Sequence, residues 1–377
     1  MKYNKLFANF LFIILLGGVI TSCRKYLDVG LPRTQLTGEA LFNSDNTAIA
    51  AMIAIYTQME QSGLAYNILT IGGTAADELT NHNTSPTAVD IASNNITPEN
   101  SIISSLWSDL YKYVYEANAV IEGVNRSDAI SQPVRRQLLG EAYFIRAYCH
   151  FYLLNFFGNI PYNMTTDYTI TSAQPQGDAS ELLSQIIADL IQSKSLLSPT
   201  YMNSNNLSTT ERVRPNKYAA ASLLAKAYLF NGEWEKAEME ADSILQHTNL
   251  YSLNSNLVNT FQKTSPEVIW QLQPVIPGFN SFAGALLQPL PFAPFFISVS
   301  AHLVDSFEAG DRRRTDWITT TTFNNKSYHW LHKYKVGQNA SSVSEFTTLI
   351  RLAEIFLVRA EARAMQDKLL AALDDIN

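Results

Sequence analysis

The chain of 377 residues has only two cysteines, Cys23 and Cys149. Cys23 closes an apolar N-terminal run, so no pair remains for a disulfide within the folded protein. Cys149 falls in the apolar helical pattern from Glu141 to Phe157, which predicts a small buried side chain. We therefore expect stability to come from a helical core, which a chain of this length can bury.

Positive charge is also scarce, because 27 Lys and Arg stand against 34 Asp and Glu, a net charge of −7. This balance argues against nucleic acid as a partner, because nonspecific binding needs a basic face. The sequence contains no G-x-S-x-G, H-E-x-x-H, P-loop or G-x-G-x-x-G pattern. We therefore expect no catalytic residues and no cofactor.

Two remaining groups of residues could in principle bind a metal or act as an acid and a base. His329 and His332 have the spacing of two metal ligands on a helix, but no third ligand is near in the sequence, so we expect no metal site. Asp77 and Glu78 are adjacent, whereas glycosidases hold two carboxylates about 5–10 Å apart across the substrate. We interpret this pair as hydrogen-bonding loop residues, with a polar ligand contact as the alternative.

The N-terminus has the features of an export signal. Lys2 and Lys5 precede the apolar run Leu6–Ile20, which is shorter than the roughly 20 residues of a membrane span. The sequence Ile20-Thr21-Ser22-Cys23 that follows looks like a bacterial lipobox. We expect residues 1–22 to be removed and Cys23 to carry the lipid, because several acyl chains hold a protein firmly on a membrane. A plain signal peptide is the alternative.

The stretch from Arg214 to Gln246 predicts two antiparallel helices that meet at Asn231-Gly232. Apolar and small residues recur on one face of each helix. They are Ala221, Leu224, Ala225, Tyr228 and Leu229 in the first helix and Trp234, Ala237, Ala241, Ile244 and Leu245 in the second. This pattern is typical of a tetratricopeptide-type (TPR) helical hairpin.

A shift of about 135 positions places Ala225 on Ala360, Gly232 on Asp367 and Ala237 on Ala372. The segment from Arg351 to Asn377 is therefore predicted to be a degenerate second copy of the hairpin. Two unrelated amphipathic hairpins are the alternative. Because one hairpin cannot bury its own apolar face, repeated units stack on one another.

The remaining chain predicts more helices than strands. Helices are expected from Asp45 to Gln61, Ile102 to Val124, Pro133 to Phe157, Ser180 to Leu197 and His302 to Glu308, and a half-buried strand from Glu267 to Gln273. A turn and short strands are expected from Asp311 to Phe323. The glycines, prolines and polar residues between Gln61 and Glu99 predict a long surface loop with a functional role.

Several segments, in this order, resemble the SusD/RagB family of surface lipoproteins of Bacteroidetes. They are Ser22–Asp28, Ala76-Asp77-Glu78, Trp107–Asn118 (WSDLYKYVYEAN), Gly140–Pro161 (GEAYFIRAYCHFYLLNFFGNIP), Ile186 with Asp189 and Leu190, Val304–Arg313, Lys333-Tyr334 and Ile350–Ala362 (IRLAEIFLVRAEA). The resemblance covers nearly the whole chain and lies in the ordered set of segments.

The resemblance implies a mostly α-helical fold, with a TPR-like α/α superhelical scaffold that carries irregular loops and a few short β-strands. It implies one domain over residues 23–377, on the outer face of the outer membrane and lipid-anchored through Cys23. The partner is expected to be a SusC-like TonB-dependent barrel, and the ligand a glycan or, alternatively, a peptide. In the family further segments follow the last hairpin, so we expect this chain, which stops at Asn377, to be truncated or to lack them.

Sugar binding needs flat apolar rings beside amides and carboxylates, and two loop regions offer both. The candidates are Tyr66, Asn67, Asp77, Asn81 and His82 in the first and Phe295, Phe296, Trp317 and Trp330 in the second. Trp107, Trp234 and Trp270 are interpreted as core residues, and Trp317 fits either role. Arg312-Arg313-Arg314 is interpreted as a solvated turn, with an anionic ligand as the alternative.

Two hypotheses of different classes follow, a non-catalytic glycan-capture lipoprotein and a TPR-like scaffold that binds a peptide or protein. A secreted glycosidase is the third and least favoured. The sequence names no particular sugar.

Overall fold

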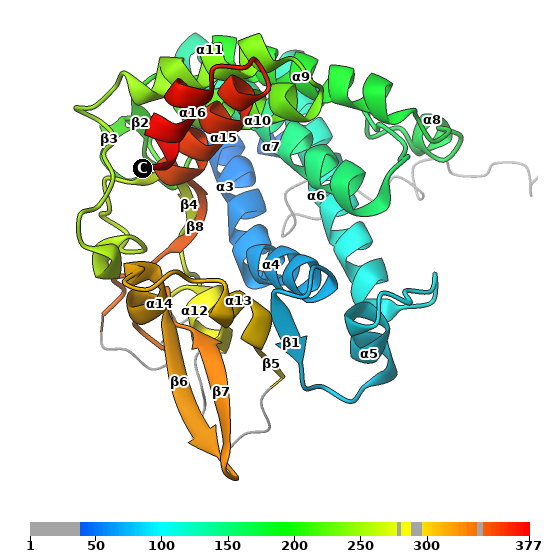
Figure 1. Cartoon of the computed structure of the whole chain (residues 1–377). Helices are drawn as coiled ribbons and strands as arrows, with labels where there is room; N and C mark the ends of the chain where they lie inside the picture. Colours follow the sequence, from blue (N-terminus) through cyan, green and yellow to red (C-terminus); the bar gives the residue numbers. More distant parts are fainter. Residues whose placement is uncertain (1–37, 277–279, 288–295, 338–341) are drawn as a thin grey trace, which may run out of the picture.

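The computed structural model describes residues 38–276, 280–287, 296–337 and 342–377. The predicted signal segment, Cys23 and the candidate Phe295 lie outside these ranges. Helices dominate the described chain, and the strands are short (Figure 1).

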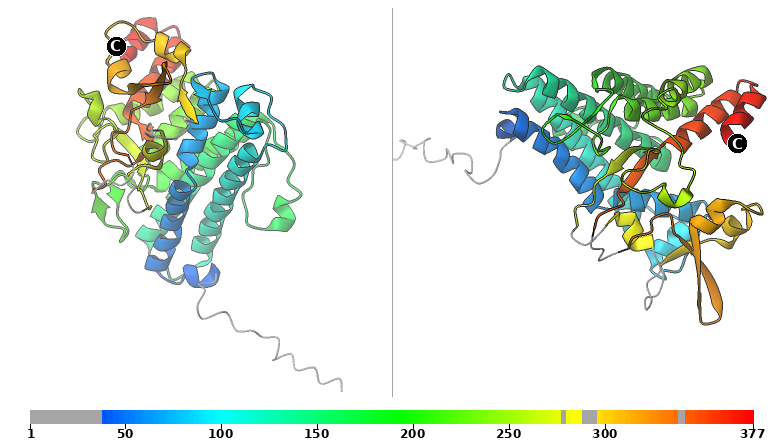
Figure 2. Two further views of the ribbon diagram at one scale, coloured as in Figure 1. Left: turned by 90° about the horizontal axis from the view of Figure 1, so that it is seen from below. Right: turned by 90° about the vertical axis from the view of Figure 1, so that its left-hand side faces the viewer.

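The longer helices form the scaffold. They are α3 Asp45–Gln61, α4 Leu64–Ala75, α6 Ser101–Arg126, α7 Gln132–Phe157, α9 Ala179–Leu196, α10 Lys217–Phe230, α11 Trp234–Leu245, α15 Leu352–Ala364 and α16 Leu369–Ile376. From α6 onward each of these helices packs on the next one in the chain. Figure 2 shows α3, α6 and α7 (blue to green) running side by side. This succession of neighbours is the TPR-like α/α scaffold that the sequence predicted.

Helix α7 lies at the centre of this scaffold and is buried on most of its sides. Leu138, Phe144 and Phe151 are buried, and the helix contacts α3, α6 and α9. It begins with Pro133 in its first turn and ends at Gly158, whose φ of +72° suits glycine. Cys149 is a free, buried thiol on this helix, as predicted.

The predicted central hairpin is confirmed as α10 and α11. Ala225 and Ala237 are fully buried, and Gly232 between the helices has a φ of +74°. The equivalent position in the last hairpin, Asp367, also has a positive φ, +60°, between α15 and α16. The shift found in the sequence therefore aligns two turns whose equivalent residues both have a positive φ.

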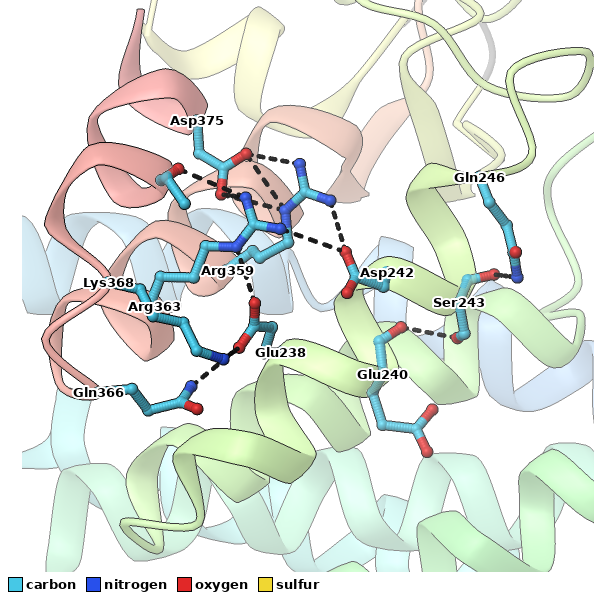
Figure 3. A network of polar contacts seen from close by, with 11 residues as sticks. Glu238, Glu240, Asp242, Ser243, Gln246, Arg359, Arg363, Gln366, Lys368 and Asp375 are labelled. Atoms are coloured by element: carbon cyan, nitrogen blue, oxygen red, sulfur yellow. Dashed lines mark hydrogen bonds and ion pairs between the residues drawn. The ribbon is translucent and has the colours of Figure 1, made fainter.

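The two hairpins meet through a network of charged side chains (Figure 3). Arg359 on α15 pairs with Asp375 of α16 and with Asp242 of α11, at 2.5 and 2.6 Å. Arg363 lies 2.9 Å from both Glu238 and Asp375. Each arginine thus joins α11 to α16, so charge pairing supplements apolar packing at this seam.

Two ion pairs are buried among the other scaffold helices, Arg146 with Asp189 and Arg214 with Glu141. Arg146 on α7 makes two hydrogen bonds, of 2.6 and 2.7 Å, to the carboxylate of Asp189 on α9. Arg146 also donates to Asn118 on α6, and Tyr162 donates to Asp189. Buried charges persist only when they are paired and hydrogen-bonded in this way, so three helices are held in register by one cluster.

Within the described ranges the strands form three small sheets. They are β1 Leu79–Asn81, β2 Tyr201–Met202, β3 Ser208–Thr209, β4 Val268–Leu272, β5 Ile297–Val299, β6 Ile318–Phe323, β7 Lys326–Leu331 and β8 Thr347–Arg351. The largest sheet has the order β1-β5-β7-β6, and all its neighbours are antiparallel. β6 and β7 form a long hairpin that points away from the helices (Figure 1). Asn324 and Asn325, both with positive φ, make its two-residue turn.

Short helices lie between the longer elements. They are α2 Gly38–Leu41, α5 Pro86–Ala92, α8 Tyr168–Thr171, α12 Phe282–Leu287, α13 Ala301–Asp305, α14 Arg312–Asp316 and the 3₁₀ turn Leu257–Asn259. The triple arginine therefore lies in a helical turn, where Arg312 pairs with Asp316 and Arg313 with Asp311.

Two predictions about local structure were wrong. The strand β4 exists, but all five of its residues are buried rather than alternating, because α3 and α10 pack on it and Trp270 fits among Tyr56, Phe144 and Tyr148. The expected long loop from Gln61 to Glu99 contains α4, β1 and α5. Gly72 and Gly73 lie inside α4, where glycine was taken as a helix breaker.

Candidate functional site

A pocket of about 290 Å³ opens between α4 and the first two strands of the large sheet. Its walls come from α4, β1, α5, α6 and the chain around β5. The lining residues are Tyr66, Asn67, Thr70, Ile71, Thr74, Asn81, Asn83, Ala88, Ile91, Ile102, Phe296 and Ile297. The region that the sequence singled out as functional therefore contributes most of the wall.

One face of α4 supplies five of these residues, because positions 66, 67, 70, 71 and 74 follow the helical period. Gly73 lies on the side of α4 that faces β1. A Cβ atom at Gly73 would come within 2.9 Å of a methyl group of Leu79, so glycine lets β1 pack closely on α4. This close approach places Asn81 opposite the polar face of α4.

The polar groups of the pocket are amides and hydroxyls held in fixed orientations. Asn81 donates to the backbone oxygen of Asn83 at 2.9 Å and accepts from its N–H at 3.0 Å. Asn67 donates to Ser62, and the Thr70 hydroxyl donates to the backbone of Tyr66 at 2.8 Å. Asn67 Oδ1 accepts no hydrogen bond from the described part of the chain, so this oxygen is available to a ligand.

The described residues that line the pocket carry no formal charge. Among the described residues that line it, the phenol of Tyr66 is the sole titratable group, and burial raises its pKa. The phenol therefore stays neutral at physiological pH and serves as a hydrogen-bond donor and acceptor. Such a pocket suits a neutral ligand with many hydroxyl groups.

A buried carboxyl group supports the aromatic side of the pocket. Glu60, at the end of α3, accepts a hydrogen bond from the N–H of Phe282 at 3.1 Å and one from the Thr347 hydroxyl at 2.9 Å. Phe282 then packs edge-on against Tyr66, with 6.0 Å between ring centres. Burial raises the pKa of Glu60 to about 7, because the charged form loses its hydration.

Four of the predicted site residues meet in this pocket: Tyr66, Asn67, Asn81 and Phe296. The structure places Asp77 elsewhere, exposed in the turn after α4 with a φ of +60°. His82 is adjacent to Asn81 but lies outside the pocket lining. It hydrogen-bonds Ser298 at 2.8 Å and packs against Tyr328, because successive side chains of a strand alternate between faces.

Trp330, a ligand candidate from the sequence, is buried and only 4% exposed. Its indole N–H donates to the Thr321 hydroxyl at 2.7 Å, across the β6–β7 pair. Trp317 is 8% exposed, contacts Phe261 and donates to the backbone of Leu257, which is the core role left open for it. Neither ring lines the α4 pocket.

His329 lies in strand β7 and His332 follows the end of that strand. The two side chains therefore do not share a helix face. His329 instead contacts the Thr320 hydroxyl at 2.9 Å. No cluster of three metal-ligating side chains occurs within the described ranges.

The residues that sequence reasoning missed are the polar Thr70, Thr74 and Asn83 and the apolar Ile71, Ala88, Ile91, Ile102 and Ile297. Thr70 and Thr74 were detectable in principle, since they follow Tyr66 at intervals of four. This spacing is informative only if residues 64–75 are recognised as a helix, and the Gly72-Gly73 pair made that helix hard to predict.

Known proteins match both the sequence and the fold. A family model described as SusD-like, "Starch-binding associating with outer membrane", matches residues 25–229, more than half of the chain. The chain belongs to this SusD-like family, as the resemblance predicted. A SusD-like protein of Formosa agariphila is 24% identical over 265 residues, which cover 67% of this chain and 49% of that protein. The chain thus spans about half the length of the curated relatives it matches.

Solved structures agree on the fold. A SusD superfamily protein of Bacteroides thetaiotaomicron has a TM-score of 0.78 at 18% identity, covering 89% of this chain and 79% of that one. A protein described as a laminarin-binding SusD-like protein has a TM-score of 0.72 at 20% identity, covering 89% of this chain and 84% of that one. Within the described ranges, no helix has the length and apolar character needed to cross a membrane.

Proposed function

We propose that this protein captures neutral oligosaccharides in the α4 pocket and does not cleave them. The observation that carries the proposal is the pocket itself, where Tyr66 and Phe296 accompany the amides of Asn67, Asn81 and Asn83 without any charged group. Sugar rings present hydroxyls to amides and C–H faces to aromatic rings. The laminarin-binding relative of the same fold supports a glucan as the first ligand to try.

Capture without cleavage agrees with the lining of the pocket. Glycoside hydrolysis uses two carboxyl groups about 5–10 Å apart across the bond that breaks. No carboxyl group is among the pocket residues, and Asp77 and Glu78 are exposed beyond the end of α4. Release of new reducing ends from a bound glucan would overturn this part of the proposal.

We further propose that the mature protein is one domain over residues 23–377, held on the outer membrane by a lipid on Cys23. In this proposal it passes its ligand to a SusC-like TonB-dependent barrel. The family's association with the outer membrane and the lipobox-like sequence support the anchor. Cys23→Ala should release the protein from the membrane fraction, and continued retention would count against the lipid anchor.

Affinity electrophoresis through gels that contain laminarin or starch tests the glycan proposal. Retardation of the wild type should be lost in Tyr66→Ala and reduced in Asn81→Ala. Tyr168→Ala is the matched control, because Tyr168 is 77% exposed on α8 and does not line the pocket. Binding to a peptide panel with no retardation by any polysaccharide would replace the glycan proposal with the peptide alternative.

A further inference from the structure

Part of the wall of the α4 pocket is aliphatic. The side chains that form this aliphatic wall come from α4, α5, α6 and β5, so tertiary packing brings them together. They are Ile71, Ala88, Ile91, Ile102 and Ile297. Aromatic rings stack on the C–H faces of sugars, whereas branched aliphatic side chains offer no flat face. The aliphatic wall therefore has a different role from that of Tyr66 and Phe296.

Ile297 belongs to the pocket rather than to the core. It pairs with Asn81 across β5 and β1, so the two side chains lie on the same side of the sheet. Ile71 and Ile91 are buried in the main hydrophobic core, and Ile102 packs against it. In the described part of the chain, the half-buried Ile297 is a member of neither hydrophobic cluster. Core packing therefore does not account for an isoleucine at this position.

The hydrogen-bonding capacity that the lining leaves for a ligand is small. Asn81 uses its side-chain amide on the backbone of Asn83, and Thr70 donates its hydroxyl to the backbone of Tyr66. Asn67 Oδ1, Asn83 Nδ2 and the Tyr66 hydroxyl form no hydrogen bond within the described ranges. These atoms are fewer than the hydroxyl groups of a hexose. A hydroxyl group that is pressed against the aliphatic wall loses its water without a replacement.

A methyl group meets no such cost. Its removal from water is favourable, and branched aliphatic side chains surround it with dispersion contacts. Neutral sugars carry methyl groups in two common forms, the C6 methyl of a 6-deoxyhexose and the acetamido methyl of an N-acetylhexosamine. Both forms replace a hydroxyl-bearing edge of the ring by an apolar one.

We infer that the α4 pocket selects a sugar residue that carries a methyl group, with the methyl against the aliphatic wall and the remaining hydroxyls toward the amides. This inference rests on the proposed capture of neutral oligosaccharides and names the class of sugar that the pocket prefers.

Saturation-transfer-difference NMR on the full chain tests the inference with matched pairs of sugars at millimolar concentration. L-Fucose is compared with L-galactose and L-rhamnose with L-mannose, and the members of each pair differ only by the hydroxyl group on C6. N-acetyl-D-glucosamine is compared with D-glucose. The three pairs therefore separate a 6-deoxy sugar from an acetamido sugar.

Variants of the wall separate its polarity from its shape. Ile297→Thr places a hydroxyl group in the aliphatic wall, and Ile297→Val is the matched control, because valine and threonine have nearly the same shape but differ in polarity. Ile102→Thr and Ile102→Val repeat the comparison from α6, where Ile102 is also half-buried. Asn67→Ala removes a polar contact that both members of a sugar pair share.

We expect the methyl-bearing sugar to bind about tenfold tighter than its partner in at least one pair, with the strongest saturation on its methyl resonance. Ile297→Thr should reduce this ratio at least about threefold, and Ile297→Val should retain it. Asn67→Ala should weaken both sugars and leave the ratio unchanged. If Ile297→Thr does not fold, the Ile102 variants decide.

Equal binding within all three pairs overturns the inference, as does a ratio that the folded threonine variants leave unchanged. The outcome is distinct from failure of the proposed function. If laminarin or starch retards the protein and the methyl-bearing sugars have no advantage, the inference alone fails. If none of these sugars and neither polysaccharide binds, the proposed function fails with it.

Discussion

The helical scaffold and the α4 pocket use polar side chains in opposite ways. In the scaffold, charged groups are buried in pairs, as in Arg146 with Asp189 and Arg214 with Glu141. In the pocket, the polar groups are neutral amides and hydroxyls that line a cavity. The segments most similar to the SusD/RagB family contain Asn118, Glu141, Arg146 and Asp189. The sequence similarity therefore reflects how the helices are held together and not which ligand is bound.

The largest expected effect comes from breaking a scaffold pair. Arg146→Leu leaves the Asp189 carboxylate buried without its partner, and removal of one member of a buried pair costs about 3–5 kcal/mol. Urea unfolding, followed by circular dichroism, measures the loss. The double variant Arg146→Leu/Asp189→Leu should be more stable than the single one. Equal stability of the single variant and wild type would show that the pair contributes nothing.

The second prediction tests whether Trp330 is a core residue or a ligand-binding residue. Trp330→Ala should lower the free energy of unfolding by about 3–5 kcal/mol, because it empties a packed site and leaves the Thr321 hydroxyl without its donor. Thr322→Ala, at an exposed position on the same hairpin, is the control. A stable Trp330→Ala protein that has lost glycan binding would restore the ligand role that the sequence suggested.

The third effect concerns the carboxyl group of Glu60, which links α3 to the aromatic side of the pocket. Its pKa is raised from 4.5 to about 7, so its contribution to stability is complete below about pH 4.5 and is lost as the pH rises through about 7. In Glu60→Gln this contribution no longer titrates.

Thermal unfolding between about pH 5 and pH 8 measures the Glu60 effect. The melting temperature of the wild type should fall relative to that of Glu60→Gln as the pH rises. Parallel curves across this range would mean that Glu60 is already ionised at pH 5.

The helices of the scaffold were predictable because their signals are local and repeated. Apolar residues at helical spacing located α6, α7, α9, α10 and α11 to within a few residues, and Gly158 and Gly232 marked ends that the structure confirms. The shift between the two hairpins was informative even though only some residues match, because a turn with positive φ tolerates both Gly232 and Asp367.

The site was less predictable because its residues meet only through long-range packing. Tyr66, Asn67 and Asn81 come from one stretch of sequence, but Phe296 joins them through the pairing of β1 with β5. The exposure of Trp317 and Trp330 depends on which distant segments cover each side chain, and no local sequence pattern encodes this. The Pro and Gly content between Gln61 and Glu99 also made α4 hard to predict. Gly73 allows close packing within this helix and does not form a turn.

The smallest expected effect tests whether burial, and not distance, makes the scaffold pairs strong. Lys368 lies 2.6 Å from Glu238 in the network between the hairpins, the same distance as in the pair of Arg146 and Asp189 (Figure 3). The side chains of Lys368 and Glu238 are 49% and 13% exposed, against 4% and 9% for the buried pair. Lys368→Met should therefore cost only about 0–1 kcal/mol, and salt should abolish the difference, because solvent and ions screen an exposed pair. Urea unfolding at low and high salt, with Arg146→Leu measured beside it, checks both points. A cost for Lys368→Met that matches Arg146→Leu and resists salt would mean that the hairpin seam behaves as buried core.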